Sequence, residues 1–214
     1  MPTVTITKRG EQRLRNGHPW IYKSDIARVE AEAGDMVQVL DARGHRSGHA
    51  LFSDRSEIAL RMFSREPEAS TLDTWRERLR RAFAFRSALG IDATAFRLVH
   101  GEADLLPSLV VDRYGDYLVV QALSQATDRL LPELTRLLVE IGAPAGILAR
   151  NDPRVRLLEG LEQRVEVLYG NVPETVEVRE GRVTYQADLF PAPIYPGQLC
   201  LPTGSGAISQ YAGL

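Results

Sequence analysis

Short segments of alternating apolar and polar residues dominate the first 65 positions of the chain. Such alternation places every second side chain on one face and is typical of half-buried β-strands. It occurs in five segments, namely TVTIT, PWIYKSD, DMVQVLD, HRSGHALFS and EIALRMFS. Between the first two, KRGEQRLRNG predicts a basic turn or a short helix that ends at Gly17. Short strands with glycine turns and one small helix predict a compact β-barrel over residues 1–66.

Helical spacing replaces this alternation after the polar segment REPEAS, which we interpret as a linker. Apolar side chains then recur three or four positions apart, at Leu72, Trp75, Leu79 and Phe83. Thr74 and Glu77 have the spacing of a capping box, and Gly90 is a typical helix stop. The pattern therefore predicts a helix from Thr74 to Leu89.

The apolar segments that follow predict one α+β layer within residues 72–189. SLVVD and YLVVQAL flank the turn RYGD and predict a hairpin. Thr127 or Asp128 is expected to cap a second helix, which is rich in leucine. AGILAR predicts a buried strand, and TVEVREGRVTYQADL predicts a further hairpin. The expected order from Leu109 onward is strand, strand, helix, strand, hairpin.

The composition is that of a globular protein, because 214 residues that are 44% hydrophobic can bury a core. The net charge is only −2, yet the first 86 residues carry 16 Lys and Arg against 12 Asp and Glu. Apart from Lys8 and Lys23 every such cation is an arginine, whose guanidinium suits phosphate. The single cysteine excludes an internal disulfide, and no apolar segment reaches signal-peptide or membrane-spanning length. We therefore expect a cytoplasmic protein without membrane contact.

The segment GHPWIYKSD combines aromatic and cationic residues within one expected strand. Alternation places His18, Trp20 and Tyr22 on one face, and Ile21 and Lys23 on the other. If the first face is exposed, unpaired bases can stack on these rings, at about 1–3 kcal/mol per base. The alternative, which we favour for Trp20, is packing inside the barrel, because small barrels need large side chains in the core.

Four cations precede this strand and have little use in packing, namely Lys8, Arg9, Arg13 and Arg15. Together with Lys23 and the aromatic face, they predict an RNA-binding surface on which cations hold phosphates. The alternative is a solvated basic face without a ligand. Arg43, at the tip of an expected hairpin, extends the same hypothetical surface, although an ordinary turn residue is the simpler interpretation.

The segment HGEADLLPSLVVDRYGD holds four carboxylates, Glu102, Asp104, Asp112 and Asp116. Acids in a loop can bind a divalent cation or act as general acid and base. Asp112 and Asp116 flank a tight turn, where short acids accept hydrogen bonds from backbone N–H groups, and we favour this structural interpretation. We therefore assign no metal site and no catalytic residue to this loop.

Several segments occur in a fixed order from about Thr3 to Leu189, namely RGEQRLRNGHPWIYKSDI, FRLVHGEADLLPSLVVDRYGDYLVVQ, RND, EGL and VLYG. In this order they resemble the bacterial 23S ribosomal RNA cytosine-5 methyltransferases of the RlmI type. The resemblance implies an N-terminal PUA barrel that binds RNA and a middle β-β-α-β-β domain. In full-length relatives it implies a further Rossmann-like domain that binds S-adenosylmethionine.

The acidic loop differs from the family at two positions. Relatives have a sequence closer to GExDGLPGL, whereas this chain has Leu105 and Ser108 where the glycines are expected. If either position requires a positive φ, the backbone there is strained by about 1 kcal/mol or more.

The C-terminal segment, residues 190–214, also departs from the family. It contains four of the 12 prolines and no sustained periodicity, so we expect a disordered tail. TGSGA has the glycines of a nucleotide loop, but only eight residues follow Gly206, too few for a helix and a second strand. Cytosine-5 chemistry requires a cysteine on a rigid scaffold, and Cys200 lies outside the matching region. We therefore expect no cofactor and no catalytic residue in this chain.

Three hypotheses follow for the function. The favoured one is that the chain is the RNA-recognition portion of a ribosomal RNA methyltransferase, bound to structured 23S ribosomal RNA and not catalytic alone. The second is an autonomous RNA-binding or assembly module. The third is an independent enzyme that uses the acidic loop over residues 102–116. A homodimer is compatible with each of them.

Overall fold

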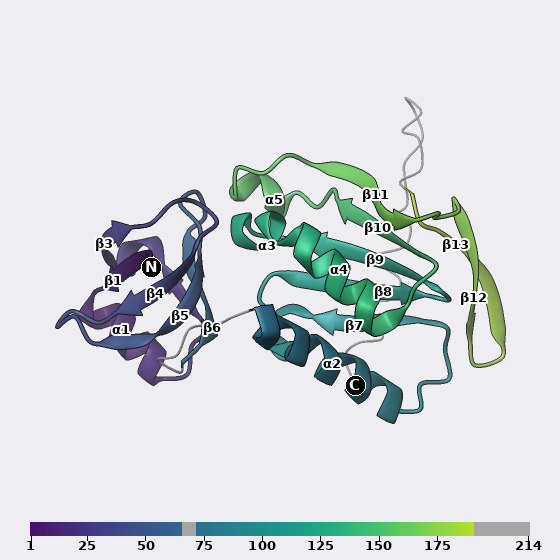
Figure 1. The fold of residues 1–214 in the computed structure, drawn as a ribbon, viewed down its shortest axis with the longest axis horizontal. Helices are drawn as coiled ribbons and strands as arrows, with labels where there is room; N and C mark the ends of the chain where they lie inside the picture. Colours follow the sequence, from purple (N-terminus) through teal and green to yellow (C-terminus); the bar gives the residue numbers. More distant parts are fainter. Residues whose placement is uncertain (66–71, 191–214) are drawn as a thin grey trace.

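The computed structural model describes residues 1–65 and 72–190 of the chain. Within these ranges, an N-terminal barrel lies beside a larger unit in which helices cover a sheet (Figure 1). The mixture of helices and strands confirms the predicted α+β class.

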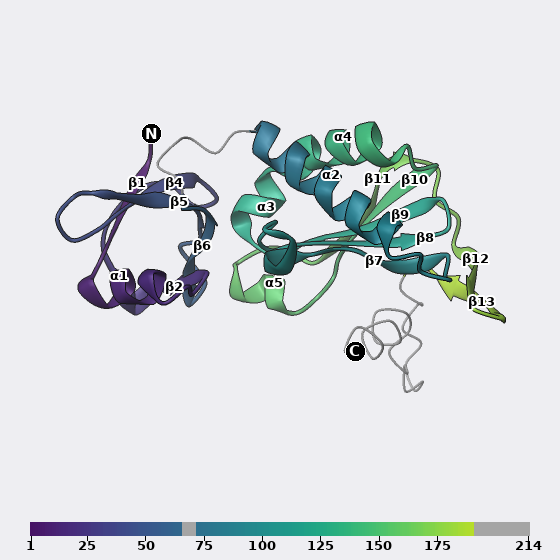
Figure 2. The same cartoon turned by 90° about the horizontal axis from the view of Figure 1, so that it is seen from below.

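The barrel is a six-stranded sheet that curls around its own apolar face (Figure 2). Its strand order is β2-β6-β5-β4-β1-β3, in which β1 and β4 are parallel. The elements are β1 (Thr3–Ile6), α1 (Lys8–Arg15), β2 (Trp20–Tyr22), η1 (Lys23–Asp25), β3 (Ile26–Glu30), β4 (Met36–Leu40), β5 (Arg46–Phe52) and β6 (Ile58–Ser64). Inward side chains from alternating positions form the barrel core, among them Val4, Ile6, Ile21, Val37 and Val39. The alternation therefore predicts the core side of these strands correctly.

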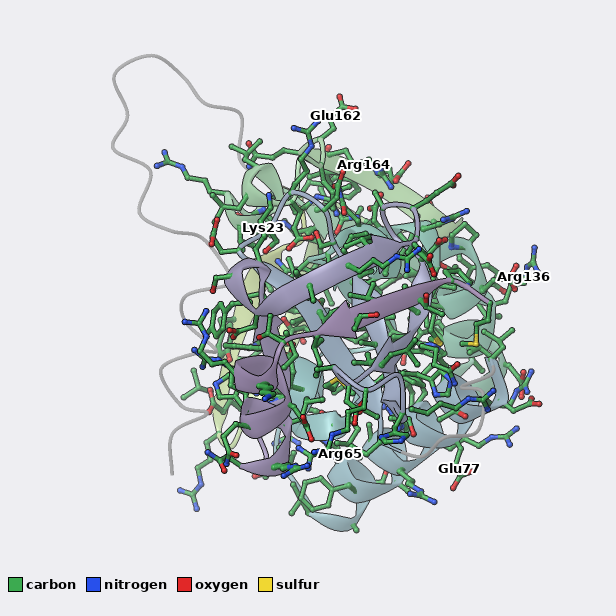
Figure 3. All side chains as sticks on the ribbon, turned by 90° about the vertical axis from the view of Figure 1, so that its left-hand side faces the viewer. Lys23, Arg65, Glu77, Arg136, Glu162 and Arg164 are labelled. Atoms are coloured by element: carbon green, nitrogen blue, oxygen red, sulfur yellow. The ribbon has the colours of Figure 1, made fainter. Side chains whose placement is uncertain are left out.

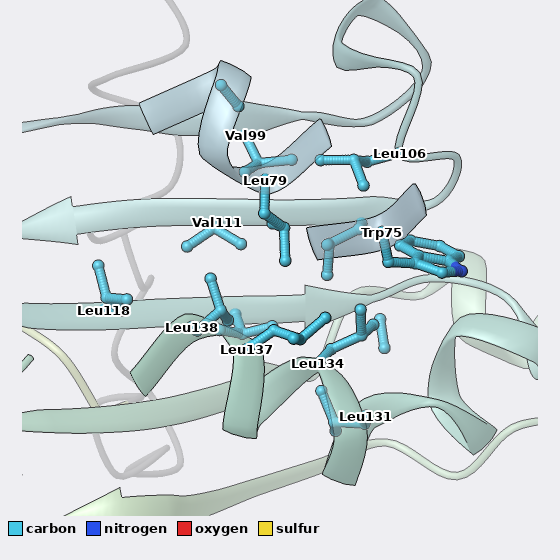
Figure 4. Packing of buried hydrophobic residues seen from close by; sticks show 14 of the residues in the cluster. Trp75, Leu79, Val99, Leu106, Val111, Leu118, Leu131, Leu134, Leu137 and Leu138 are labelled. Carbon is cyan, nitrogen blue, oxygen red and sulfur yellow. The ribbon is translucent and has the colours of Figure 1, made fainter. Parts of the chain in front are cut away.

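The second unit is built on a five-stranded sheet of order β11-β10-β9-β8-β7. The pair β9 and β10 is parallel, and the other neighbouring strands are antiparallel. Its elements are α2 (Leu72–Ala88), β7 (Ala95–His100), η2 (Gly101–Asp104), β8 (Leu109–Tyr114), β9 (Tyr117–Ala122), α3 (Gln125–Arg129), α4 (Leu131–Gly142), β10 (Gly146–Asn151), α5 (Val155–Leu158) and β11 (Arg164–Gly170). Helices α2 and α4 lie across one face of the sheet, and the main core fills the space between them and the strands (Figure 4).

Several details of this unit differ from the sequence expectation. The pattern does not predict β7 and β11, which form the two edges of the sheet. The expected last hairpin exists as β12 (Thr175–Glu180) and β13 (Val183–Asp188), but it forms a separate two-stranded sheet. The leucine-rich helix is preceded by a short helix of its own, α3, which is capped by the hydroxyl of Ser124 rather than by Thr127 or Asp128.

The two units share a packed boundary. Leu51 and Phe63 of the barrel belong to the core of the second unit, and the Phe63 ring stacks on Trp75 of α2 with centroids 4.7 Å apart. Beside this apolar contact, Arg61 donates a hydrogen bond to the carboxylate of Glu159 at 2.8 Å, and both side chains are buried. This ion pair joins β6 to the residue after α5 (Val155–Leu158) at a place that is shielded from water.

Candidate RNA interface

Helix α1 carries the predicted basic cluster on the outside of the barrel. The hydroxyl of Thr7 accepts a hydrogen bond from the Gly10 backbone N–H at 3.2 Å and caps the first turn. After the helix, Gly17 has a φ of +87°, which lets the chain turn into β2. The segment is therefore a helix rather than a basic turn, and its end lies next to the aromatic strand.

Two of the four predicted cations on α1 are held by one buried acid. Asp25 has no exposed surface, and its carboxylate pairs with Arg9 and with Arg13, the latter at 2.7 Å between Nε and Oδ2. Arg9 also donates to the hydroxyl of Ser24 at 2.8 Å. These contacts attach α1 to η1, so Arg9 and Arg13 have a structural role that the sequence analysis did not assign.

The other two cations are more available to a ligand. Lys8 is exposed and forms no ion pair within the described residues. Arg15 is 70% exposed and pairs with Glu11 one turn earlier, a contact that water and salt weaken strongly. Lys8 and Arg15 are therefore the members of the cluster that can bind a phosphate without losing a strong interaction within the protein.

The aromatic face agrees with the predicted alternation. His18, Trp20 and Tyr22 are half-buried on the same side of the strand, while Ile21 is fully buried in the barrel core. The His18 ring lies 6.0 Å from the Trp20 ring and 6.1 Å from the Tyr22 ring, measured between centroids. The guanidinium of Arg13 lies 4.8 Å from the centroid of the Tyr22 ring, so cation and aromatic face form one surface.

Trp20 does not occupy the favoured core position. It is absent from the apolar clusters of the described residues, and its indole Nε1 donates a hydrogen bond to Oε1 of Glu102 in the second unit at 3.1 Å. The reason is that Ile21 already fills the inward position of this short strand. The contact between Trp20 and Glu102 fixes the edge of the indole ring and leaves part of its surface exposed.

Lys23 and Arg43 lie apart from α1 in their contacts. Lys23 belongs to η1 rather than to the expected strand, and its ammonium donates to the backbone carbonyl of Asp54 at 3.2 Å. Arg43 lies in the loop between β4 and β5, where its backbone N–H donates to Asp41 at 2.8 Å. The backbone N–H of His45 lowers the pKa of the Asp41 carboxyl, although burial of the group opposes this shift. Arg43 is thus part of an ordered turn, and among the described residues no hydrogen bond or ion pair joins it to α1.

Two of the four carboxylates of the acidic loop, Asp104 and Asp112, are paired with arginines, and Glu102 accepts the hydrogen bond from Trp20. Asp104 accepts two hydrogen bonds from Arg86, at 2.5 and 2.8 Å, and Asp112 accepts two from Arg97, at 2.8 and 3.2 Å. The hydrogen bond to Asp112 raises the pKa of Arg97, against the effect of burial. The expected capping of backbone N–H groups by Asp112 is therefore wrong. Within residues 1–65 and 72–190, no three potential ligands come close enough to hold a metal ion.

The same loop contains the backbone strain that is predicted when Leu105 and Ser108 stand where glycines are expected. Leu105 has a φ of 59° and Ser108 a φ of 61°, so both adopt the left-handed conformation in which glycine is favoured. The backbone N–H of Leu105 donates to the carbonyl of Glu102 at 3.1 Å and closes this turn.

The first comparison with known proteins concerns the barrel. Residues 4–65 match the family model of the PUA-like domain. The matched range contains α1, strands β2 to β6 and all of β1 except Thr3. The barrel is therefore similar to the PUA-like domain, and we call residues 1–65 the PUA-like domain below. This confirms the β-barrel predicted from short alternating strands and the PUA fold that the family resemblance implies.

Similarity to longer proteins extends beyond the PUA-like domain. Ribosomal RNA large subunit methyltransferase I of Tolumonas auensis is 36% identical over 176 residues, which are 80% of this chain and 44% of that protein. The protein of the same name from Aliivibrio fischeri is 34% identical over 193 residues, or 87% of this chain and 49% of that protein. The predicted resemblance is confirmed over most of the chain, which spans about half the length of these relatives.

Solved structures with the same fold include a candidate SAM-dependent methyltransferase from Streptococcus mutans, with a TM-score of 0.73 at 17% identity. A second is SMU.776, a candidate methyltransferase complexed with SAH, with a TM-score of 0.75. Each match covers 88% of this chain and 48% of the other. At this identity they establish the fold of the PUA-like domain together with the second unit.

Two further expectations concern features outside this surface. Cys200 and the TGSGA segment lie outside the described residues, so the structure does not test what was expected of them. Among the described helices, none combines the length and the apolar character that crossing a membrane requires.

Proposed function

We propose that this chain is the RNA-recognition part of an S-adenosylmethionine-dependent methyltransferase that modifies the RNA of the large ribosomal subunit. Its proposed ligand is structured 23S RNA. The observation that carries the proposal is the joint surface of α1 and β2 on the PUA-like domain. There, the guanidinium of Arg13 lies against the half-buried ring of Tyr22, and Lys8 and Arg15 are exposed on the same helix. Cations hold the phosphates, and unpaired bases stack on exposed ring surface. The names of the related proteins support ribosomal RNA as the class of ligand.

We further propose that the chain by itself binds no methyl donor and transfers no methyl group. A donor site of the Rossmann type needs a glycine-rich turn between a strand and the helix that follows it. In the parallel unit of this sheet, β9 is joined to α3 by Leu123 and Ser124, and neither residue is glycine. The cytoplasm, where ribosomal RNA is modified, is the compartment in which we expect this recognition.

Binding of a 23S RNA fragment by the purified chain tests the proposal, with fluorescence anisotropy as the readout. Arg15→Gln and Lys8→Gln are expected to weaken binding and to reduce its dependence on salt, by a slope of roughly 0.7 per lost phosphate contact. Arg136→Gln is the matched control, because Arg136 is 74% exposed and pairs with Glu133 much as Arg15 pairs with Glu11. Arg136 points outward at the edge away from α1 (Figure 3).

Equal effects of the Arg15 and Arg136 substitutions would refute this surface as the binding site. Calorimetric titration of the same protein with S-adenosylmethionine is expected to give no heat of binding. Micromolar binding of the donor would overturn the second part of the proposal.

A further inference from the structure

One arginine of α2 differs from its neighbours in having no carboxylate partner among the described residues. The guanidinium carbon of Arg78 lies 4.0 Å from the centroid of the Phe63 ring, and its Nη1 donates to the backbone carbonyl of Leu105 at 2.6 Å. The ring and the carbonyl fix the plane of the guanidinium but leave its positive charge unpaired.

The other arginines of this helix are neutralised by acids. Arg76 and Arg80 both pair with Glu140, at 3.3 and 2.8 Å, and Arg81 pairs with Glu77 at 2.9 Å. Arg86 pairs with Asp104 through two hydrogen bonds. Within residues 1–65 and 72–190, Arg78 is thus the arginine of this helix that has no acidic partner.

The surroundings of Arg78 also destabilise the charged form of its guanidinium. Burial lowers the pKa of its guanidinium, and the positive charge of Arg81 lowers it further. An arginine nevertheless stays protonated at neutral pH. An anion bound beside it would therefore relieve an existing electrostatic cost.

Arg78 lies close to the aromatic face of the PUA-like domain, because a single turn of chain touches both. The turn is η2 with its C-terminal residue: Trp20 donates to Glu102, and Arg78 donates to the carbonyl of Leu105. Glu102 and Leu105 are three residues apart in the chain, and the backbone N–H of Leu105 donates to the carbonyl of Glu102 at 3.1 Å, so both contacts lie on one tight turn. The indole of Trp20 and the guanidinium of Arg78 therefore border the same short loop from opposite units.

We propose that bound RNA crosses from the PUA-like domain to α2 over this loop, with an unpaired base at Trp20 and a backbone phosphate on Arg78. This inference rests on the proposed function and adds a second contact region to it. A planar guanidinium that is already oriented loses little conformational entropy when it binds a phosphate. The position also explains why Trp20 is held by its edge, since the contact with Glu102 leaves ring surface exposed beside the loop.

The test compares two arginines of one helix in binding to a single-stranded segment of 23S RNA. Arg78→Gln is expected to reduce the slope of log K against log salt by about 0.7, whereas Arg80→Gln leaves it unchanged. The affinity of the unsubstituted protein divided by that of Arg78→Gln is then expected to be roughly 2.6 times smaller at 200 mM salt than at 50 mM salt. Arg78→Lys, which keeps the charge, is expected to restore the slope.

A second measurement does not depend on the stability of the variants. In the unsubstituted protein, the NMR signal of the Arg78 Nε–H group is expected to shift on addition of the RNA, while that of Arg80 stays in place. An unchanged Arg78 signal, or equal slopes for Arg78→Gln and Arg80→Gln, overturns the inference. If Arg15→Gln still weakens binding in that case, the proposed function stands and only the crossing over η2 is lost. If Arg15→Gln also has no effect, the proposed function itself fails.

Discussion

The buried pair of Arg61 and Glu159 allows a quantitative prediction about the boundary between the two units. The side chains are 8% and 1% exposed, and the carboxylate also accepts a hydrogen bond from the hydroxyl of Ser53. Arg61→Met removes the cation and leaves the carboxylate buried without its partner. A buried charge that loses its partner destabilises a protein by about 3–5 kcal/mol. We expect a loss of this size in the free energy of unfolding, measured by urea denaturation.

A double-mutant cycle isolates the interaction energy between Arg61 and Glu159 from the contributions of their other neighbours. Glu159→Gln removes the negative charge but keeps an acceptor for Ser53, so Arg61→Met combined with Glu159→Gln is expected to recover about 2 kcal/mol of the loss. Arg76→Met is the control, because Arg76 forms ion pairs on the exposed surface and is expected to cost less than about 1 kcal/mol. The reasoning is refuted if Arg61→Met costs no more than Arg76→Met, because water would then reach the pair in solution.

Three further predictions concern individual side chains. Leu105→Gly and Ser108→Gly are each expected to stabilise the protein by about 0.5–1 kcal/mol in urea denaturation, because they relieve a positive φ, whereas Gly101→Ala, at a φ of 51°, is expected to destabilise it. Asp25→Asn is expected to cost about 1–3 kcal/mol, because it weakens the attachment of α1, and a melting temperature equal to that of the unsubstituted protein would contradict this role. Burial raises the pKa of Tyr114 to about 12, against about 10 in the unfolded chain. The unfolded state then loses its proton first, so stability falls between pH 10 and 12 by on the order of 2 kcal/mol, and Tyr114→Phe is expected to remove this part of the fall.

The sequence predicts best those features that depend on local periodicity. Alternation in β2 places Ile21 in the core and the aromatic rings on the other face, and the structure agrees. Strand β7 is harder to recognise, because its register shifts between Arg97 and Val99 and the alternation is interrupted there. Lys23 was assigned to a strand because a 3₁₀ turn of three residues leaves no periodic signal.

The contacts that define the site were not predictable in the same way. Glu102 is 82 positions from Trp20 in the chain, and Asp25 meets Arg9 and Arg13 only after α1 folds back on η1. Spacing in the sequence carries no information about such pairs. The positive φ of Leu105 and Ser108 could be predicted, because the family resemblance implies glycine at these positions and glycine favours a positive φ.

Because Leu51 and Phe63 pack into the core of the neighbouring unit, part of the surface of the PUA-like domain is apolar and is covered by that unit. A fragment that stops at Arg65 would present both side chains to water and would tend to aggregate. Transplanting this barrel onto another enzyme, or replacing it with a different one, therefore requires redesign of the surface beneath Trp75 as well as a suitable linker. In evolution, substitutions on either side of this boundary are expected to be accepted in pairs.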